Sequence, residues 1–484
     1  MDLSIKMGTT WLWSLMHSFH LVIHVLHYHL VMLSSALFSL ALCSVVQAGS
    51  FDLTTPRIEL DDRLQLEQFL NAEQATCPIR DNFSIQVTEH LHPGICAHDN
   101  HHPTQNTSSV QTADPISPWT IYPTCTTNTT KKFCVFTSQT FHANRGITIL
   151  TTPSTARVLS RLPAFHTKTP HLSPLSENDH RDPPFVVSAI PGRGMGLIAN
   201  RTIERGDLIK SHPAIAIFHN DAVTKGHALY PTHYAPLMHL AINQLPPPTR
   251  SLFLAMAAHN VTEEPYIERI YTNTFGEDFN NQEHSIVIPE TARLNHDCRP
   301  NAMYYFDPRT LVHYTHAARR IYAGEEITIT YVDPLQTRLK RRAAIKRSWG
   351  FECSCSLCSQ GVQFVRESNR RIVRINELMK MFGDLDLKVE GKGKKGAKVG
   401  GSPEIAELLV GLFEQERLYA SIVDAYRVAA LAYAAKGMEW RAVMWAMRAV
   451  EAGLIHDGPR GAGVLDMKRL LTAPREHWSW GVKL

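Results

Sequence analysis

The stretch ARLNHDCRPNAMYYF, residues 292–306, decides how this sequence is interpreted. It places Asn295, His296 and Cys298 within four positions, and three consecutive aromatic residues follow at 304–306. One such side chain can be a packing choice, but this many in one run favours a binding or catalytic site. Motifs that could complete such a site lie upstream at 192–196 and downstream at 353–358.

Three cysteines downstream form a C-x-C-x2-C cluster at Cys353, Cys355 and Cys358. They lie too close in sequence to pair sensibly among themselves, and thiolates at this spacing readily wrap one zinc ion. Tetrahedral zinc needs a fourth ligand, and Cys298 is the only other cysteine in this half of the chain. The pattern predicts a zinc site of Cys298, Cys353, Cys355 and Cys358. The alternative is a set of buried free thiols.

Two further motifs are weak when each is taken alone. GRGMG, residues 192–196, allows close approach of a ligand to the backbone, but a plain hairpin turn explains it equally well. It also lacks the strand and helix context of a dinucleotide fold. GEEITITYVD, residues 324–333, predicts a turn and then a strand that carries Tyr331, and a strand tyrosine is usually part of a core.

The four motifs together, in the order GRGMG, RLNHDCRPN, GEEITITYVD and WGFECSCSLC, resemble those of SET-domain protein lysine methyltransferases. The resemblance covers residues 184–358 and is closest to the SET-and-MYND group and its fungal relatives. It implies an α+β protein: an irregular, small-sheet SET β-fold with a pseudoknot and a post-SET zinc site, followed by an α-helical C-terminal domain. Ala, Tyr and Leu at helical spacing around a Gly turn make that domain tetratricopeptide-like, and the alternative is any other helical hairpin. Residues 200–290 contain no cysteine, so the MYND zinc finger of that group is missing.

The resemblance also implies roles for individual residues. S-adenosylmethionine would be the methyl donor, and a lysine of a protein or peptide, histones included, would accept the methyl group. Tyr331 would be catalytic, and Tyr304 and Phe306 would line the substrate channel. The residues expected to contact the donor are Arg193, Gly194, Met195, Leu294, Asn295, His296, Tyr331, Trp349 and Phe351. The alternative is a catalytically silent SET-fold protein that docks peptides through its C-terminal helices.

Composition divides the chain into six parts: a hydrophobic leader (1–48), a poorly packed N-terminal arm (49–180), the SET domain (181–334), a post-SET zinc segment (335–360), a helix with a basic linker (361–402) and a helical C-terminal domain (403–484). A length of 484 residues suits two or three domains. The formal net charge of +4 does not by itself indicate nucleic-acid binding.

The leader makes the expected location ambiguous. Residues 11–46 contain no Asp, Glu, Lys or Arg, which is typical of a signal peptide or membrane anchor and would direct the chain to the secretory pathway or a membrane. In a secreted chain Cys77, Cys96, Cys125 and Cys134 would form two disulfides, with three connectivities open. Zinc thiolates and the methyl donor instead belong in the nucleus or cytoplasm, and the leader would then be a gene-model artefact.

Overall fold

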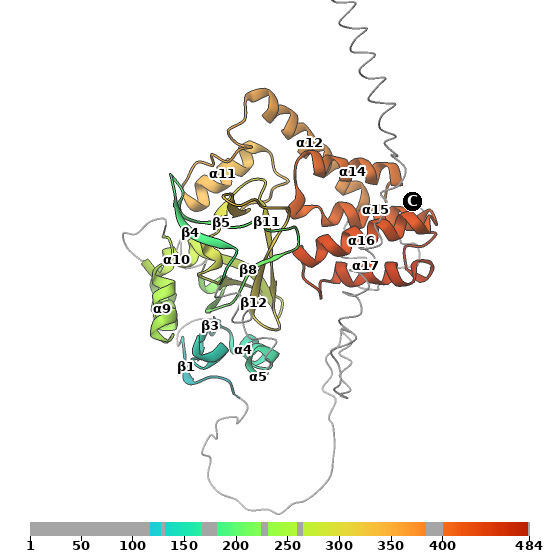
Figure 1. Cartoon of the computed structure of the whole chain (residues 1–484). Helices are drawn as coiled ribbons and strands as arrows, with labels where there is room; N and C mark the ends of the chain where they lie inside the picture. The colour runs from blue at the N-terminus through green and yellow to red at the C-terminus, as the bar shows by residue number, and fades with distance from the viewer. Residues whose placement is uncertain are drawn as a thin grey trace, which may run out of the picture. The chain divides into compact units, whose positions relative to one another are not determined.

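The computed structural model describes residues 117–126, 131–166, 182–223, 231–258, 265–383 and 400–482 (Figure 1). The leader, residues 49–116 of the expected arm and most of the basic linker lie outside these ranges. Among the described helices, none has the length and apolar character needed to cross a bilayer.

The largest sheet has six strands in the order β1-β2-β3-β7-β9-β8. Its strands are β1 (Ile121–Cys125), β2 (Cys134–Ser138), β3 (Ile147–Thr151), β7 (Ala216–His219), β8 (Thr274–Phe279) and β9 (Gln282–Val287). All neighbours are antiparallel except β3 and β7, which run parallel. Strands from the N-terminal region therefore share one sheet with strands more than a hundred residues later.

The prediction of a poorly packed N-terminal arm is wrong for residues 117–166. Strands β2 and β3 are buried at every position, and Ile147, Ile149 and Leu150 are fully buried. The helices α4 (Pro153–Leu159) and α5 (Pro163–His166) follow, and Thr152 caps α4 by accepting a hydrogen bond from the Thr155 N–H. This segment is a structural half of the large sheet.

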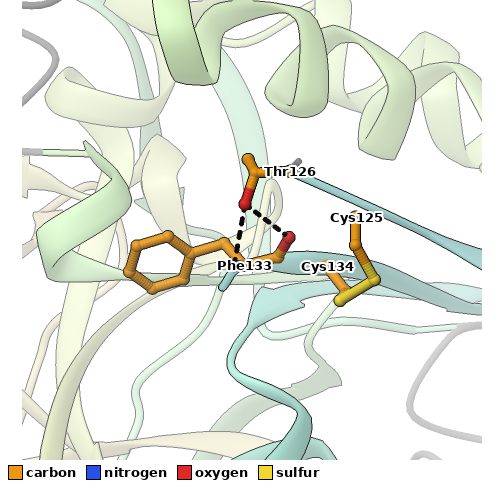
Figure 2. The surroundings of a disulfide bond; sticks show 4 residues. All are labelled: Cys125, Thr126, Phe133 and Cys134. Carbon is orange, nitrogen blue, oxygen red and sulfur yellow. Dashed lines mark hydrogen bonds between the residues drawn. A yellow bond between two sulfur atoms is a disulfide. The ribbon is translucent and has the colours of Figure 1, made fainter. Parts of the chain in front are cut away.

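One disulfide joins the first two strands. Cys125 and Cys134 face each other across β1 and β2 and are bonded. Figure 2 shows the neighbouring pair, in which the Phe133 N–H donates to Thr126 Oγ1 at 3.2 Å. The sequence left three disulfide connectivities open, and the Cys125–Cys134 bond belongs to one of them. Cys77 and Cys96 lie outside the described residues.

Two smaller sheets carry the motifs. One has the order β10-β13-β5-β4 and the other β11-β12-β6. The strands are β4 (Phe185–Ile190), β5 (Gly194–Ala199), β6 (Leu208–Pro213), β10 (Asn295–His296), β11 (Ala302–Asp307), β12 (Val312–Ala317) and β13 (Glu326–Ile329). The parallel pairing of β10 with β13 sets His296 opposite Ile329, two residues before Tyr331. Pairing of β13 with β5, which begins at Gly194, brings the glycine turn close to His296 and Tyr331.

Three helices between β7 and β8 pack against the large sheet: α8 (Pro231–Asn243), α9 (Pro247–Leu254) and α10 (Pro265–Asn273). They share one core with β2, β3 and β7, in which Phe218 and Phe253 are fully buried. After β13 comes α11 (Arg338–Trp349), which ends at Gly350 in the left-handed conformation that glycine adopts at low cost.

The rest of the chain is helical, as expected from the sequence. It comprises α12 (Val362–Phe382), α14 (Pro403–Gln415), α15 (Val423–Ala435), α16 (Glu439–His456) and α17 (Ala462–Thr472). Alanines dominate the buried face of α15, which lets α16 pack closely. The mixed α+β class with C-terminal helices is therefore confirmed, and the tetratricopeptide-like character stays a prediction.

The buried carboxylate of Glu416 links the C-terminal helices to the motif at 292–306 through ion pairs. Glu416, whose side chain is only 2% exposed, forms ion pairs of 2.6 Å with both Arg299 and Arg371. Ser368 donates a further hydrogen bond of 2.8 Å. Burial alone would raise the pKa of Glu416, but the bonds from Arg299 and Ser368 outweigh it and lower that pKa. The motif at 292–306, helix α12 and the end of α14 thus meet at the Glu416 carboxylate.

Replacing Glu416 by Gln should therefore destabilise the protein. The change leaves Arg299 buried without its counter-ion, and breaking such a pair costs about 3–5 kcal/mol of unfolding free energy at pH 7. Because the folded pKa is lowered, the Glu416 contribution is present above the unfolded value of about 4.3 and fades as the pH falls through the folded pKa. Denaturant unfolding at several pH values measures both effects.

Glu414→Gln is the matched control, since Glu414 is exposed on the same helix and should change stability by no more than about 0.5 kcal/mol. Equal effects of the two substitutions at pH 7, or a Glu416→Gln deficit that does not shrink in acid, would contradict the role of this ion pair.

Candidate functional site

The four motifs converge on one cavity of about 510 Å³. Its wall is built from the glycine turn, the 292–306 stretch, the end of β13 and the end of α11. Among the residues singled out from the sequence, those that line it are Arg193, Gly194, Met195, Leu294, Asn295, Tyr304, Tyr331, Trp349 and Phe351. The volume is typical of a small-molecule site.

Glu326 organises one side of the cavity. Its carboxylate pairs with Arg193 at 2.5 Å and accepts a hydrogen bond from Asn295 Nδ2 at 2.9 Å. Arg193 also donates to the carbonyl of His296, and Asn295 Nδ2 reaches the carbonyl of Met195 at 3.3 Å. These bonds tie the glycine turn to the 292–306 stretch and hold both against β13.

Gly196 is required by this network. A Cβ at this position would lie 2.8 Å from Asn295 Nδ2 and 2.9 Å from Glu326 Oε1. Real Cβ atoms do not approach other atoms so closely, so any larger residue would displace the Asn295 amide or the Glu326 carboxylate. The last glycine of GRGMG is therefore explained by close packing inside the site, and a plain hairpin turn would not need it.

His296 lies behind the cavity wall and does not line it. Burial lowers the pKa of His296 to about 4, so the ring is neutral near pH 7. Its Nδ1 accepts a hydrogen bond from the Tyr331 N–H at 3.0 Å, which leaves the proton on Nε2, 3.4 Å from Cys298 Sγ. His296 thus couples the backbone of Tyr331 to the cysteines, while only its carbonyl faces Arg193.

Tyr331 presents a protonated hydroxyl. Burial raises the pKa of Tyr331 to about 12, so the phenol keeps its proton at neutral pH. The hydroxyl donates to the carbonyl of Leu294 at 2.6 Å. The ring packs against Trp349 with centroids 5.1 Å apart, and the Trp349 indole donates to the carbonyl of Thr272 at 3.1 Å. Tyr331 is thus suited to orienting a ligand and unsuited to accepting a proton.

The structure separates the two aromatic residues predicted to line a channel. Tyr304 reaches the cavity, stacks on His313 at 4.6 Å and meets Phe275 edge-on at 5.0 Å. Phe306 instead packs with Phe279 in the core of the large sheet. The two share a face of β11, but a strand rises about 3.4 Å per residue, which carries Phe306 roughly 7 Å past the cavity.

Part of the lining was not predicted from the sequence. Residues 255–258, after α9, and 272–275, where α10 meets β8, form a wall of the cavity. Except for Met256 and Phe275 they are small or polar residues, and none belongs to a chemical motif. Only their place in the fold brings them to the site.

The four cysteines predicted as metal ligands come together. Their sulfurs all lie within 4.8 Å of one another, with Cys298 3.6 Å from Cys358 and 3.9 Å from Cys353. Tetrahedral thiolate ligands at about 2.3 Å from zinc would stand about 3.8 Å apart, so the spacing fits such an ion. Hydrogen bonds from Cys298 and Cys353 lower the pKa of Cys355 to about 5, which favours a thiolate.

A buried arginine lies beside the sulfurs. Arg341 of α11 is 1% exposed, and its guanidinium donates to the carbonyl of Gln336. Burial opposes its charge, but the Cys298 and Cys358 sulfurs raise the pKa of the guanidinium. The cluster thus has a compensating cation of its own.

Comparison with known proteins finds similarity to SET-domain proteins. Residues 194–332 match the SET domain model. Histone-lysine N-methyltransferase set5 of Schizosaccharomyces pombe is 26% identical over 309 residues, which cover 60% of this chain and 85% of that protein. Histone-lysine N-methyltransferase SMYD3 of Mus musculus is 42% identical over 73 residues, or 15% of this chain and 16% of that one.

A SET and MYND domain-containing protein of Dictyostelium discoideum is 34% identical over 99 residues, which cover 18% of this chain and 29% of its own. The matches to this protein and to SMYD3 therefore span less than a third of each relative. The SET match covers the glycine turn, the 292–306 stretch and the strand that precedes Tyr331. Residues 194–332 thus form a SET domain, and the chain is similar to fungal SET5 and to SET-and-MYND proteins.

Proposed function

We propose that this protein is an S-adenosylmethionine-dependent protein-lysine N-methyltransferase that acts on histones or other proteins. The observation that carries the proposal is the convergence of Asn295, Tyr331 and Trp349 on one cavity. The named activity of the set5 and SMYD3 relatives supports it.

The residues present suit the donor. Gly194 leaves room for close approach to the backbone, because no atom lies within 4 Å of where its Cβ would be. The Asn295 side chain and the backbone of the glycine turn line the cavity, and Trp349 and Phe351 offer aromatic faces to the adenine. When bound, S-adenosylmethionine would supply a methyl group on a cationic sulfur.

The protein's own contribution would be orientation and desolvation. A free lysine amine has a pKa of about 10.4 and is mostly protonated, but burial beside a cation lowers this value. Tyr304 and Phe275 would wall the channel, and the Tyr331 hydroxyl would orient the amine. The described lining contains no Asp, Glu or His, so the amine proton would pass to water and not to a side-chain base.

Zinc on Cys298, Cys353, Cys355 and Cys358 completes the proposal. The three late cysteines follow α11 directly, and Trp349 and Phe351 stand at the junction. A metal that joins Cys298 to this loop would hold the aromatic pair against the cavity. Its role is structural, because four thiolates leave no open coordination position.

Tyr331→Phe tests the chemistry. We expect binding of S-adenosylmethionine to persist, because the ring remains. The turnover number on histone substrates should fall by about 100-fold, the loss typical of one positioned hydrogen-bonding group. Tyr122→Phe is the control, since Tyr122 is 87% exposed, and it should keep full activity. If the wild type binds donor and transfers no methyl group to any histone or peptide array, the protein is a silent SET-fold binder.

Gly196→Ala tests the donor site. A Cβ would push Asn295 or Glu326 aside, and overpacking of about 1–3 kcal/mol should weaken S-adenosylmethionine binding roughly tenfold in titration calorimetry. Gly276→Ala is matched, because Gly276 is also a strand glycine and has open space around its Cβ position. An unchanged dissociation constant for Gly196→Ala would count against this placement of the donor.

Metal analysis tests the cysteine cluster. Purified protein should carry one zinc per chain, and Cys355→Ser should lose most of it and unfold at a lower temperature. A double variant, Cys125→Ser with Cys134→Ser, changes two cysteines outside the cluster and should retain the metal. Protein that folds and binds donor without stoichiometric zinc would refute the metal site.

A further inference from the structure

Positive charge is concentrated in the segment after the cavity strands. Residues 338–382 contain eleven Lys or Arg and three Glu, a formal charge of +8, whereas the whole chain has +4. The remainder of the chain is therefore net negative. The charge is carried mainly by α11 and α12, which Figure 1 labels.

Helix α11 has no acidic residue. Arg341 points toward the sulfurs, but Lys340, Lys346 and Arg347 are exposed. Within the described residues, Glu352 is the acidic group that pairs with α11, contacting Arg342 at 2.9 Å and Lys346 at 3.9 Å. Most of the outer charge of α11 is thus available to a partner.

Helix α12 adds a second basic row. Its inner face, with Ile372, Ile375 and Leu378, is buried in the C-terminal core, and Arg366, Arg370 and Arg374 are exposed. Arg370 and Arg374 pair with glutamates of the same helix, whereas Arg366 has no ion pair among the described residues.

The two rows adjoin. Asn369 Oδ1, in the middle of α12, accepts a hydrogen bond of 3.0 Å from the backbone N–H of Arg338 at the start of α11. We call the exposed Lys and Arg residues of α11 and α12 the basic surface. Its far end lies at the cavity, because Trp349, the last residue of α11, lines it.

The composition of α11 points away from lipid. A helix that lies on a membrane buries a continuous apolar face. The one large apolar side chain that α11 exposes is Leu339, at 79%, so α11 has no such face. Helix α12 buries its inner face in the C-terminal core but exposes Val362, Phe364, Val373 and Met381, so the comparison with anionic vesicles is part of the test below. Arginine predominates in the segment, and its planar donor fork matches phosphate oxygens in pairs.

We propose that the basic surface binds the phosphate backbone of duplex DNA. Helix α11 is about 18 Å long, and about 18 Å of duplex DNA carries about ten phosphates on its two strands, of which the helix can contact those on the near side. The choice of DNA rests on the proposed function, since a histone substrate is packaged with duplex DNA. Binding at α11 would hold that substrate beside the cavity without reading base sequence.

The test measures the affinity of the full chain for a labelled 30-base-pair duplex of arbitrary sequence, by fluorescence anisotropy over a series of salt concentrations. The variant combines Lys340→Glu, Arg347→Glu and Arg366→Glu, none of which touches the cavity. Each lost phosphate contact lowers the slope of log affinity against log salt by about one. We expect the slope to fall by about three and the affinity at 0.1 M salt to drop at least tenfold.

The control combines Arg157→Glu, Arg161→Glu and Lys436→Glu, exposed residues elsewhere in the described chain that change the net charge equally. It should retain the wild-type slope. Equal losses in both triple variants, no binding of the duplex by wild type, or binding to anionic vesicles in preference to DNA would each overturn the proposal.

Methylation of free histones separates this inference from the proposed function. The basic-surface variant should methylate free histones at the wild-type rate and methylate reconstituted nucleosomes more slowly. Activity on free histones without DNA binding would refute the basic surface alone. Salt-dependent DNA binding, lost in the variant, by a protein that methylates nothing would refute the methyltransferase proposal and leave the surface standing.

Discussion

The meeting of four cysteine sulfurs is the constraint on which the rest of the site depends. Cys298 lies 55 residues before Cys353, and their sulfurs are 3.9 Å apart. Two residues before Cys298, the ring of His296 accepts the N–H of Tyr331, and four residues before Cys353 stands Trp349. One contact between distant loops therefore sets the relative positions of three parts of the cavity wall.

The stretch at 292–306 is crowded because it faces three neighbours at once. Asn295 turns to Glu326 and the cavity, and His296 and Cys298 turn to the sulfur cluster. Arg299 turns to the buried Glu416 and so to the C-terminal helices. Each of these side chains makes a different contact, so the two-residue strand β10 and the turn after it are fixed by side-chain bonds to three neighbours.

Short sequence motifs predicted those features of the fold and site that depend on residues close together in the sequence. The C-x-C-x2-C cluster and Cys298 were brought together as expected, and α12 lies within residues 361–402, where a helix was expected. Strands β2 and β3 were missed because they are five residues long and buried on both faces, so they show no alternation. The second partner of β3 is β7, which lies far along the chain. Residues 255–258 carry no chemical signature at all.

Helix α11 shows how much of the structure rests on the sulfurs. Only Arg341 and Ile345 of its twelve residues are buried, so it lacks the apolar stripe by which helices usually dock. A helix of this length is marginal in water by itself, and six like charges on it repel one another. Its place must come from its ends: the Trp349 indole bonded to Thr272, Gly350 as the terminator, and the sulfur cluster with Arg341 beside it. Because the outer residues of α11 do not help to position it, they can be basic without displacing the helix.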